Sequence, residues 1–213
     1  MISVWDVWSV WWIVLYGRVG AAMEIALRVS DKYFDELMAL FFCEISDDDD
    51  FYDIVAVQLA AGYRQQLEMM LDSLSVKRLR AGICGLGIIS SAESDSVIKK
   101  FISHDEPLIV AAAIDGLRLI GAADWSAVSW QLQHPSPFVR GATLRFAKDR
   151  LGEEALPLLL RGLHDEDAIV RENAIDELDG LISSDSAYLI SPYLDDPSAH
   201  VRQAAKSLLD SID

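Results

Sequence analysis

The chain contains little proline, little cysteine and few basic residues, and each shortage excludes a class of protein. Its 213 residues include 6 prolines and 2 cysteines. The cysteines, Cys43 and Cys84, are too few for a disulfide-rich scaffold and form no Cys-x-x-Cys motif. Buried thiols in a reduced, cytoplasmic compartment are therefore expected. Scarce proline, and the lack of any long run of alternating apolar and polar residues, predict an all-α protein.

Basic residues are outnumbered, because 18 lysines and arginines stand against 34 aspartates and glutamates, for a formal net charge of −16. Nucleic-acid binding draws most of its affinity from neutralising phosphates, so no nucleic-acid partner is expected. The acidic excess is greatest between residues 151 and 213, which hold fourteen acidic and four basic residues. Such a surface attracts basic protein partners, although acidity can also serve only to keep an apolar-rich chain in solution.

Motifs for catalysis are missing as well. The sequence has no Gly-x-Ser-x-Gly elbow, no Walker loop and no His-Glu-x-x-His motif, so no catalytic, cofactor or metal residue is assigned and no enzyme is expected. His104, His134 and His164 recur at 30-residue steps. A shared zinc would need their nitrogens within about 2.1 Å of one ion, whereas equivalent positions of packed helices lie about 8–10 Å apart. A common metal is therefore not expected.

A repeat of 30–31 residues is the most informative pattern in the chain. Three Val-Arg pairs, at 139–140, 170–171 and 201–202, are spaced by 31 residues, and Leu79-Arg80 and Ile109-Val110 extend the series backwards at steps of 30. A small residue follows each anchor from Ile109 onwards after four positions, and an apolar residue follows every anchor at or beside the eighth. A fixed period of this length indicates stacked supersecondary units, none of which buries its own apolar face alone.

The clearest unit runs from residue 152 to 181. Leucines at helical spacing between 156 and 163 predict a first helix, with Pro157 inside its first turn. A polar turn at 164–167 supplies a carboxylate that can cap the next helix. A second apolar stripe from Ile169 to Leu181 then predicts the second helix of a hairpin.

This unit resembles the HEAT repeat, whose pattern has an Asp-containing turn followed by Val-Arg, a small residue and a leucine. The resemblance is strong over residues 63–213 and weaker over 1–62, where degenerate capping repeats are expected. In HEAT-like repeats the arginine pairs with an aspartate of a neighbouring turn, which here implicates Asp165 and Asp196.

The resemblance implies a right-handed α–α superhelix that fills the chain as a single domain over 1–213. About seven helical hairpins are expected. The earlier helices are placed at 3–16, 18–29, 32–45, 51–61, 63–74 and 76–89.

One turn holds the densest cluster of charge, formed by Asp47, Asp48, Asp49 and Asp50. A calcium-binding EF-hand loop starting there would need glycine and glutamate where the chain has Tyr52 and Gln58. No metal is therefore assigned. The run is expected to be a solvated turn that caps the following helix, with docking of a basic partner as the alternative.

The N-terminus carries Trp5, Trp8, Trp11 and Trp12 in an apolar run that is too short to span a bilayer. Asp6 stands where a signal peptide would be basic, so secretion is disfavoured. No membrane partner is expected. A capping helix packed on the first repeat is favoured, and an aromatic anchor for a partner around Trp8 is the alternative.

In this repeat class the second helix of each hairpin lines the concave face. Polar residues there, off the apolar stripe, are candidate partner contacts: Asp115, Arg118, Arg145, Glu172, Asp176, Glu177 and Asp179. The expected function is a non-enzymatic module that binds and neutralises a basic protein, most concretely an immunity protein inhibiting a nucleic-acid-degrading toxin. The alternative is a scaffold for protein assembly, followed by an enzyme resembling the HEAT-like DNA glycosylases or the bilin lyases.

Overall fold

The computed structural model describes residues 33–43, 49–121 and 123–212, and over these ranges it is helical without a strand. The predicted helices at 3–16 and 18–29, with Trp8, lie outside the described residues, as do Asp47 and Asp48. Asp49 and Asp50 form the first turn of a helix, but their side chains are not described. The predictions for the tryptophans and the acidic run therefore stay predictions.

The elements follow the predicted order of hairpins. The α-helices are α3 (Phe34–Phe42), α4 (Asp49–Met70), α5 (Val76–Ile89), α6 (Asp95–Ile98), α7 (Pro107–Ile120), α8 (Trp125–Val128), α9 (Pro137–Leu151), α10 (Leu156–Gly162), α11 (Ala168–Asp176) and α12 (Ala199–Ile212). Short 3-10 helices accompany them: η2 (Leu71–Ser73), η3 (Ala92–Ser94), η4 (Lys99–Ser103), η5 (Ser129–Gln133), η6 (Gly152–Ala155), η7 (Ser184–Leu189) and η8 (Ser191–Asp195).

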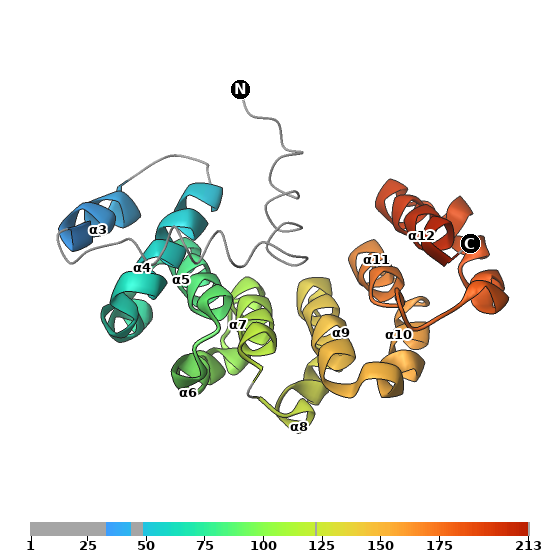
Figure 1. Cartoon of the computed structure of the whole chain (residues 1–213), viewed down its shortest axis with the longest axis horizontal. Coiled ribbons are helices and arrows are strands. Elements are labelled where there is room, and N and C mark those ends of the chain that lie inside the picture. Colours follow the sequence, from blue (N-terminus) through green and yellow to red (C-terminus); the bar gives the residue numbers. More distant parts are fainter. Residues whose placement is uncertain (1–32, 44–48, 122, 213) are drawn as a thin grey trace.

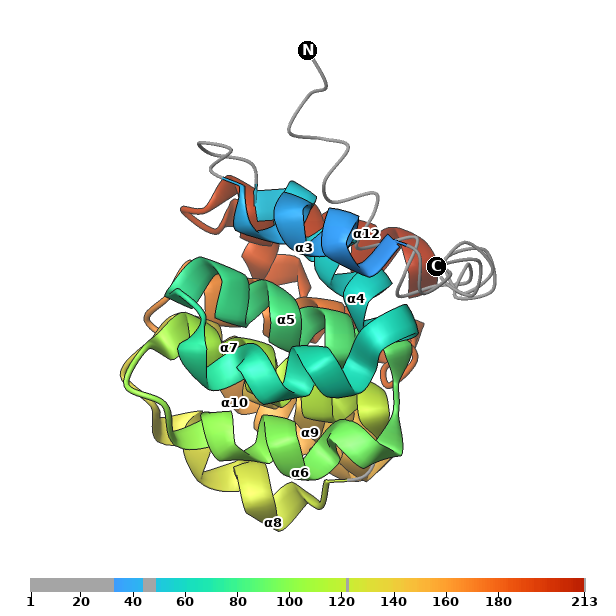
Figure 2. The ribbon, with the colours of Figure 1, turned by 90° about the vertical axis from the view of Figure 1, so that its left-hand side faces the viewer.

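The hairpins stack into a curved solenoid. In Figure 1 the second helices, α5, α7, α9, α11 and α12, line the inner side of an arc, while α6, α8 and α10 lie on the outer side. Figure 2, turned by 90°, shows the same two layers with successive hairpins one behind another. Each second helix packs on the next, from α4 against α5 through to α11 against α12. The prediction of an all-α HEAT-like superhelix is confirmed, with six of the expected seven hairpins in the described ranges.

The repeated anchors hold the stack together because they face its core. All five anchor positions are buried: Leu79, Ile109, Val139, Val170 and Val201. The residues four positions later are also buried, and from Ala113 onwards they are small, so neighbouring helices can approach closely. Buried side chains form two apolar clusters that meet at α9, where Phe146 belongs to the first cluster and Leu144 to the second.

Several boundaries differ from the sequence prediction. The helices expected at 51–61 and 63–74 form one element, α4, which bends at Tyr63 (φ −141°, ψ 41°). Outer helices are short because 3-10 turns replace part of each, as in η5 and η8. α11 ends at Asp176, before the predicted Leu181, and Gly180 then adopts φ +72° in the turn that leaves it.

The cysteines are unpaired, as expected, but only one is a core residue. Cys84 is buried on α5, and burial raises the pKa of its thiol to about 12. Cys43 is only half-buried, contrary to the prediction, because it ends α3, where its Sγ donates to the carbonyl of Leu40. In the described ranges no helix combines the length and the apolar character that a bilayer crossing requires.

Candidate functional site

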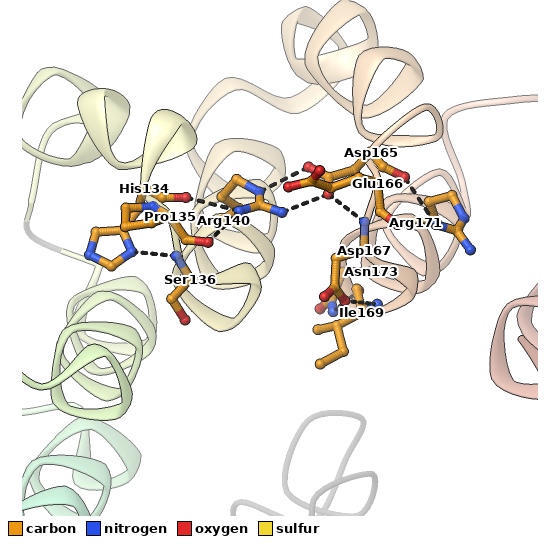
Figure 3. Close-up of polar contacts among 10 residues, drawn as sticks. All are labelled: His134, Pro135, Ser136, Arg140, Asp165, Glu166, Asp167, Ile169, Arg171 and Asn173. Atoms are coloured by element: carbon orange, nitrogen blue, oxygen red, sulfur yellow. Dashed lines mark hydrogen bonds and ion pairs between the residues drawn. The ribbon is translucent and has the colours of Figure 1, made fainter.

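The Val-Arg arginines tie consecutive turns together along one edge of the solenoid (Figure 3). Arg140 donates through Nε and Nη2 to the two carboxylate oxygens of Asp165, at 2.9 and 2.7 Å. Its Nη1 donates to the carbonyls of His134 and Pro135, both at 2.9 Å, at the start of its own helix. The arginine therefore closes its own turn and clamps the next one.

Arg171 repeats this geometry one repeat later. Its Nε and Nη2 lie 2.9 Å from the carboxylate oxygens of Asp196, and its Nη1 donates to the carbonyls of Asp165 and Glu166. The hydrogen bonds from Arg171 hold the pKa of Asp196 below its usual range. Pairing of these arginines with Asp165 and Asp196 is confirmed, so this ladder is a structural device and not a phosphate track.

Arg202 makes only half of this arrangement. Its Nη1 donates to the carbonyls of Asp196 and Pro197, at 2.7 and 3.0 Å, as in the other two repeats. Its Nε and Nη2 meet no carboxylate among the described residues.

The repeated histidines are part of the turn chemistry. Nδ1 of His104 accepts from the backbone N–H of Glu106, and Nδ1 of His134 accepts from that of Ser136. Asp165 plays the same part for the N–H of Asp167. His104 and His134 thus occupy the aspartate place in the template, and His164 lies one residue out of register. The described ranges contain no group of three side chains suited to a metal ion.

The one dense basic stretch, at 76–80, is also engaged in the fold. Arg78 donates to the backbone carbonyls of Phe41, Phe42 and Cys43 at the end of α3. Arg80 pairs with Asp53 of α4 at 3.0 Å. These guanidinium groups join the first described hairpins and do not form a free basic patch.

On the concave face, charged residues occupy equivalent places in successive helices. The central row contains Asp115 of α7, Arg145 of α9 and Asp176 of α11. Arg145 donates to both carboxylate oxygens of Asp115, at 3.0 and 2.5 Å, and also to the side-chain oxygen of Asn173 on α11. One arginine therefore bridges three repeats.

Asp115 was predicted to be an accessible contact residue, and the structure corrects this. The residue is 8% exposed, and its carboxylate is also held by Arg118, whose Nε lies 3.3 Å away. Burial opposes ionisation, but Arg145 and Arg118 outweigh it and lower the pKa of Asp115. Since Arg118 also pairs with Asp149 at 2.9 Å, neither arginine is a free contact.

Two further acidic candidates lie at the ends of the inner helices. Glu177 is half-buried, and its carboxylate lies 4.0 Å from Nζ of Lys148. Lys148 donates to the backbone carbonyl of Asp179, whose own exposed carboxylate accepts from Ser211 at 3.4 Å. Asp179 remains accessible, and Glu177 is partly compensated.

Glu172 and Asp176 form the uncompensated part of this face. They are one turn apart on α11, and within the described ranges neither has a hydrogen bond or an ion pair from its carboxylate. Burial raises the pKa of Glu172. Desolvation by the surrounding protein, followed by repulsion from Glu172 and Glu177, raises the pKa of the Asp176 carboxyl to about 7. Asp176 nevertheless has an exposed side chain, so a partner can reach it.

The Arg145–Asn173 contact and the burial of Asp115 were not predicted from the sequence. The signal was present, because Asp115, Arg145 and Asp176 are spaced by 30 and 31 residues and alternate in charge. In a stack of this period, equivalent positions are neighbours, so opposite charges there should pair.

The stacked helical hairpins are similar to those of known proteins. Residues 126–210 match the family of HEAT repeats. A chain in the complex of CpcE and CpcF of phycocyanin lyase from Nostoc sp. PCC7120 is 18% identical, over 92% of this chain and 89% of that one, with a TM-score of 0.54. An engineered protein is 14% identical, over 83% of this chain and 96% of that one, with a TM-score of 0.47. No curated protein matches the sequence. The fold is thus a HEAT-like solenoid.

Proposed function

We propose that this HEAT-like solenoid is a non-enzymatic protein-binding module that receives a basic group of another protein at Glu172 and Asp176. The observation that carries this proposal is the contrast along the concave face. Asp115 is paired with two arginines, whereas Glu172 and Asp176 make no ion pair within the described ranges and interact with His200 and Arg145 only at longer range. Two carboxylates that form no ion pair within the fold favour binding of a lysine or arginine side chain from a partner protein.

The charge of the whole chain supports the same choice of partner. The formal net charge is −16, and many of the arginines on the inner face and the turns are already paired within the fold. An acidic field of this size accelerates the approach of a basic protein and repels nucleic acids and anionic membranes. A cytoplasmic location is part of this proposal.

The most concrete form of the proposal is an inhibitor of a nucleic-acid-degrading toxin, that is, an immunity protein. A nuclease needs a basic surface to hold phosphates, so it offers the cations with which Glu172 and Asp176 could pair. The support is charge complementarity alone. The test is co-purification with the product of a neighbouring reading frame that encodes a basic nuclease, followed by a nuclease assay with and without this chain.

A scaffold for protein assembly is the second candidate. The solved structure from Nostoc is a complex of two proteins, CpcE and CpcF, and its chain has this fold. An enzyme of the lyase type is less well supported, because the likeness to the phycocyanin lyase chain is 18% in sequence and shows the fold alone.

The proposed site is tested by charge reversal with a matched control. Glu172→Lys with Asp176→Lys should slow the association of a lysine decapeptide, measured by fluorescence anisotropy, and raising salt from about 50 mM to about 0.5 M should weaken the wild-type complex. Glu153→Lys with Glu154→Lys changes the net charge equally but alters exposed residues of η6. Equal weakening by both pairs would show attraction to net charge alone and remove the site.

A further inference from the structure

A row of apolar side chains runs along the concave helices at one repeated position. Leu108, the second residue of α7, is 42% exposed, and Phe138, the second residue of α9, is 48% exposed. Ile169, the second residue of α11, is partly exposed. Each directly precedes a buried anchor, so the helix turns the anchor inward and leaves this residue outside.

These residues belong to the concave face and not to the core. Residues three, four and seven apart share one side of a helix, so Ile169 lies on the same side of α11 as Glu172 and Asp176. In the same way, Phe138 shares a side of α9 with Arg145. The apolar row therefore runs beside the row of charges across three repeats.

A single exposed apolar residue needs no explanation, but the repetition does. The equivalent position is polar at both ends of the row, with Arg78 on α5 and His200 on α12. Arg78 is used to hold the end of α3. The apolar row is thus confined to α7, α9 and α11, the helices that lead to the two uncompensated carboxylates.

We propose that the concave face binds an amphipathic helix of the partner, whose apolar side chains cover Leu108, Phe138 and Ile169 and whose lysines or arginines reach Glu172 and Asp176. This inference rests on the proposed function and specifies the partner. Charge complementarity decides the occupant. An apolar strip beside unpaired carboxylates fits a basic amphipathic segment and disfavours nucleic acid and anionic lipid.

Spacing and backbone chemistry favour a helix as the bound segment. Packed helices lie about 8–10 Å apart, so the row presents one apolar contact at each such step. A helix rises about 1.5 Å per residue, so side chains seven residues apart are about 10 Å apart on one face. An extended segment would need partners for its backbone groups, whereas the concave helices already use theirs internally.

The probe is a synthetic helical peptide of about 21 residues, with leucines seven residues apart and lysines beside the third leucine. Two matched peptides replace the leucines by serine or the lysines by glutamate. Binding is measured by fluorescence anisotropy at low salt. The leucine–lysine peptide should bind, and each matched peptide should bind about tenfold more weakly or less, because each lacks one half of the recognition.

Protein variants locate the contact. Phe138→Ser should weaken binding of the leucine–lysine peptide about tenfold. Trp130→Ser removes an apolar side chain that is 53% exposed on η5 of the outer layer, and it should leave the affinity unchanged. Glu172→Gln with Asp176→Asn should weaken binding as strongly as Phe138→Ser.

The outcomes separate the two proposals. If the serine peptide binds as well as the leucine peptide and still depends on Glu172 and Asp176, the amphipathic partner is overturned and the basic site stands. If the leucine peptide binds but ignores the change at Glu172 and Asp176, the basic site is overturned. The inference is overturned if Phe138→Ser and Trp130→Ser weaken binding equally, or if the leucine–lysine peptide does not bind. The proposed function is tested separately, by binding of the lysine decapeptide.

Discussion

Single arginines connect this fold across its repeats. Arg140 and Arg171 each bind two carbonyls of their own turn and both oxygens of an aspartate 25 residues later. The interaction is partly buried, so it is shielded from solvent more than an ordinary surface pair. Where the template has Val110 in place of arginine, the following turn has His134 in place of aspartate. The two partners are not always exchanged together, because Arg80 precedes a turn with His104 and pairs with Asp53 instead.

Arg171→Ala should destabilise the fold by about 1–3 kcal/mol, because it leaves the nearly buried carboxylate of Asp196 without its bidentate partner. Arg202→Ala is the matched control, since Arg202 binds only backbone carbonyls and should cost less. Urea unfolding near neutral pH measures both. Equal losses of unfolding free energy would show that the carbonyl contacts, and not the aspartate, carry the stabilisation.

Asp176 should make stability fall as pH rises. Its pKa is raised to about 7 in the fold, mainly by desolvation and then by Glu172 and Glu177, from an ordinary value of 3.8. The folded state therefore holds this proton more tightly, and the penalty for ionisation grows between about pH 4 and pH 7 and is complete above pH 7.

Asp176→Asn removes this penalty, so the variant should melt at a higher temperature than wild type at pH 8. The difference should shrink as the pH falls and vanish near pH 4. Thermal denaturation across this range measures it, with Asp210→Asn on the exposed side of α12 as a control. A difference that does not change with pH would contradict the assignment.

At the scale of elements, glycine decides how closely two helices approach. A Cβ built on Gly85 of α5 would lie 2.7 Å from the backbone carbonyl of Ala56 on α4, which cannot move without shifting a helix. At Gly141 of α9 the nearest atoms belong to the side chain of Asn173, at 3.0 Å; displacing it would strain its hydrogen bonds to Arg145 and Ile169 but would shift no helix.

Gly85→Ala should therefore cost about 1–3 kcal/mol through overpacking. Gly141→Ala should stay within about 1 kcal/mol of wild type, because alanine also favours the helix. Chemical denaturation compares the two variants. A larger loss at Gly141 than at Gly85 would mean that the helix spacing is set elsewhere.

The sequence predicted the elements better than the site. The anchors at 79, 109, 139, 170 and 201 give the register of every hairpin from the third onwards, and with it the Arg171–Asp196 pair. The bend at Tyr63 was not predicted as part of one helix, because a two-helix pattern and a bent helix share the same apolar spacing. The burial of Asp115 could not be read from α7 alone, since it is produced by Arg145 from the next repeat.

At the scale of the whole molecule, a destabilising substitution should loosen the repeats next to it more than distant repeats. Its apolar core is divided into two clusters that meet at α9. In stacked repeats each unit contacts only its neighbours, so stability is distributed along the chain. The two ends of the arc can therefore open to different extents.

Leu159→Ala tests this, because Leu159 is fully buried on α10 within the second cluster. Truncation should cost about 2–5 kcal/mol in that cluster. Hydrogen exchange followed by mass spectrometry should show faster exchange in α10, α11 and α12, with little change in α5 and α7. Uniform acceleration along the whole chain would instead indicate a single cooperative unit.

Because Arg202 pairs with no aspartate among the described residues, a further repeat could be designed to pack on α12. The guanidinium of Arg202 is already oriented by hydrogen bonds to two backbone carbonyls. In the repeat of Arg171 the pairing residue is an aspartate 25 residues later in the sequence. An appended repeat with an aspartate at that distance would lock onto Arg202. The exposed side of α12, now polar at Gln203 and Lys206, would have to become apolar to receive it. The repeat period thus specifies where an added arginine–aspartate pair would form, so the arc could be lengthened by one repeat at a time.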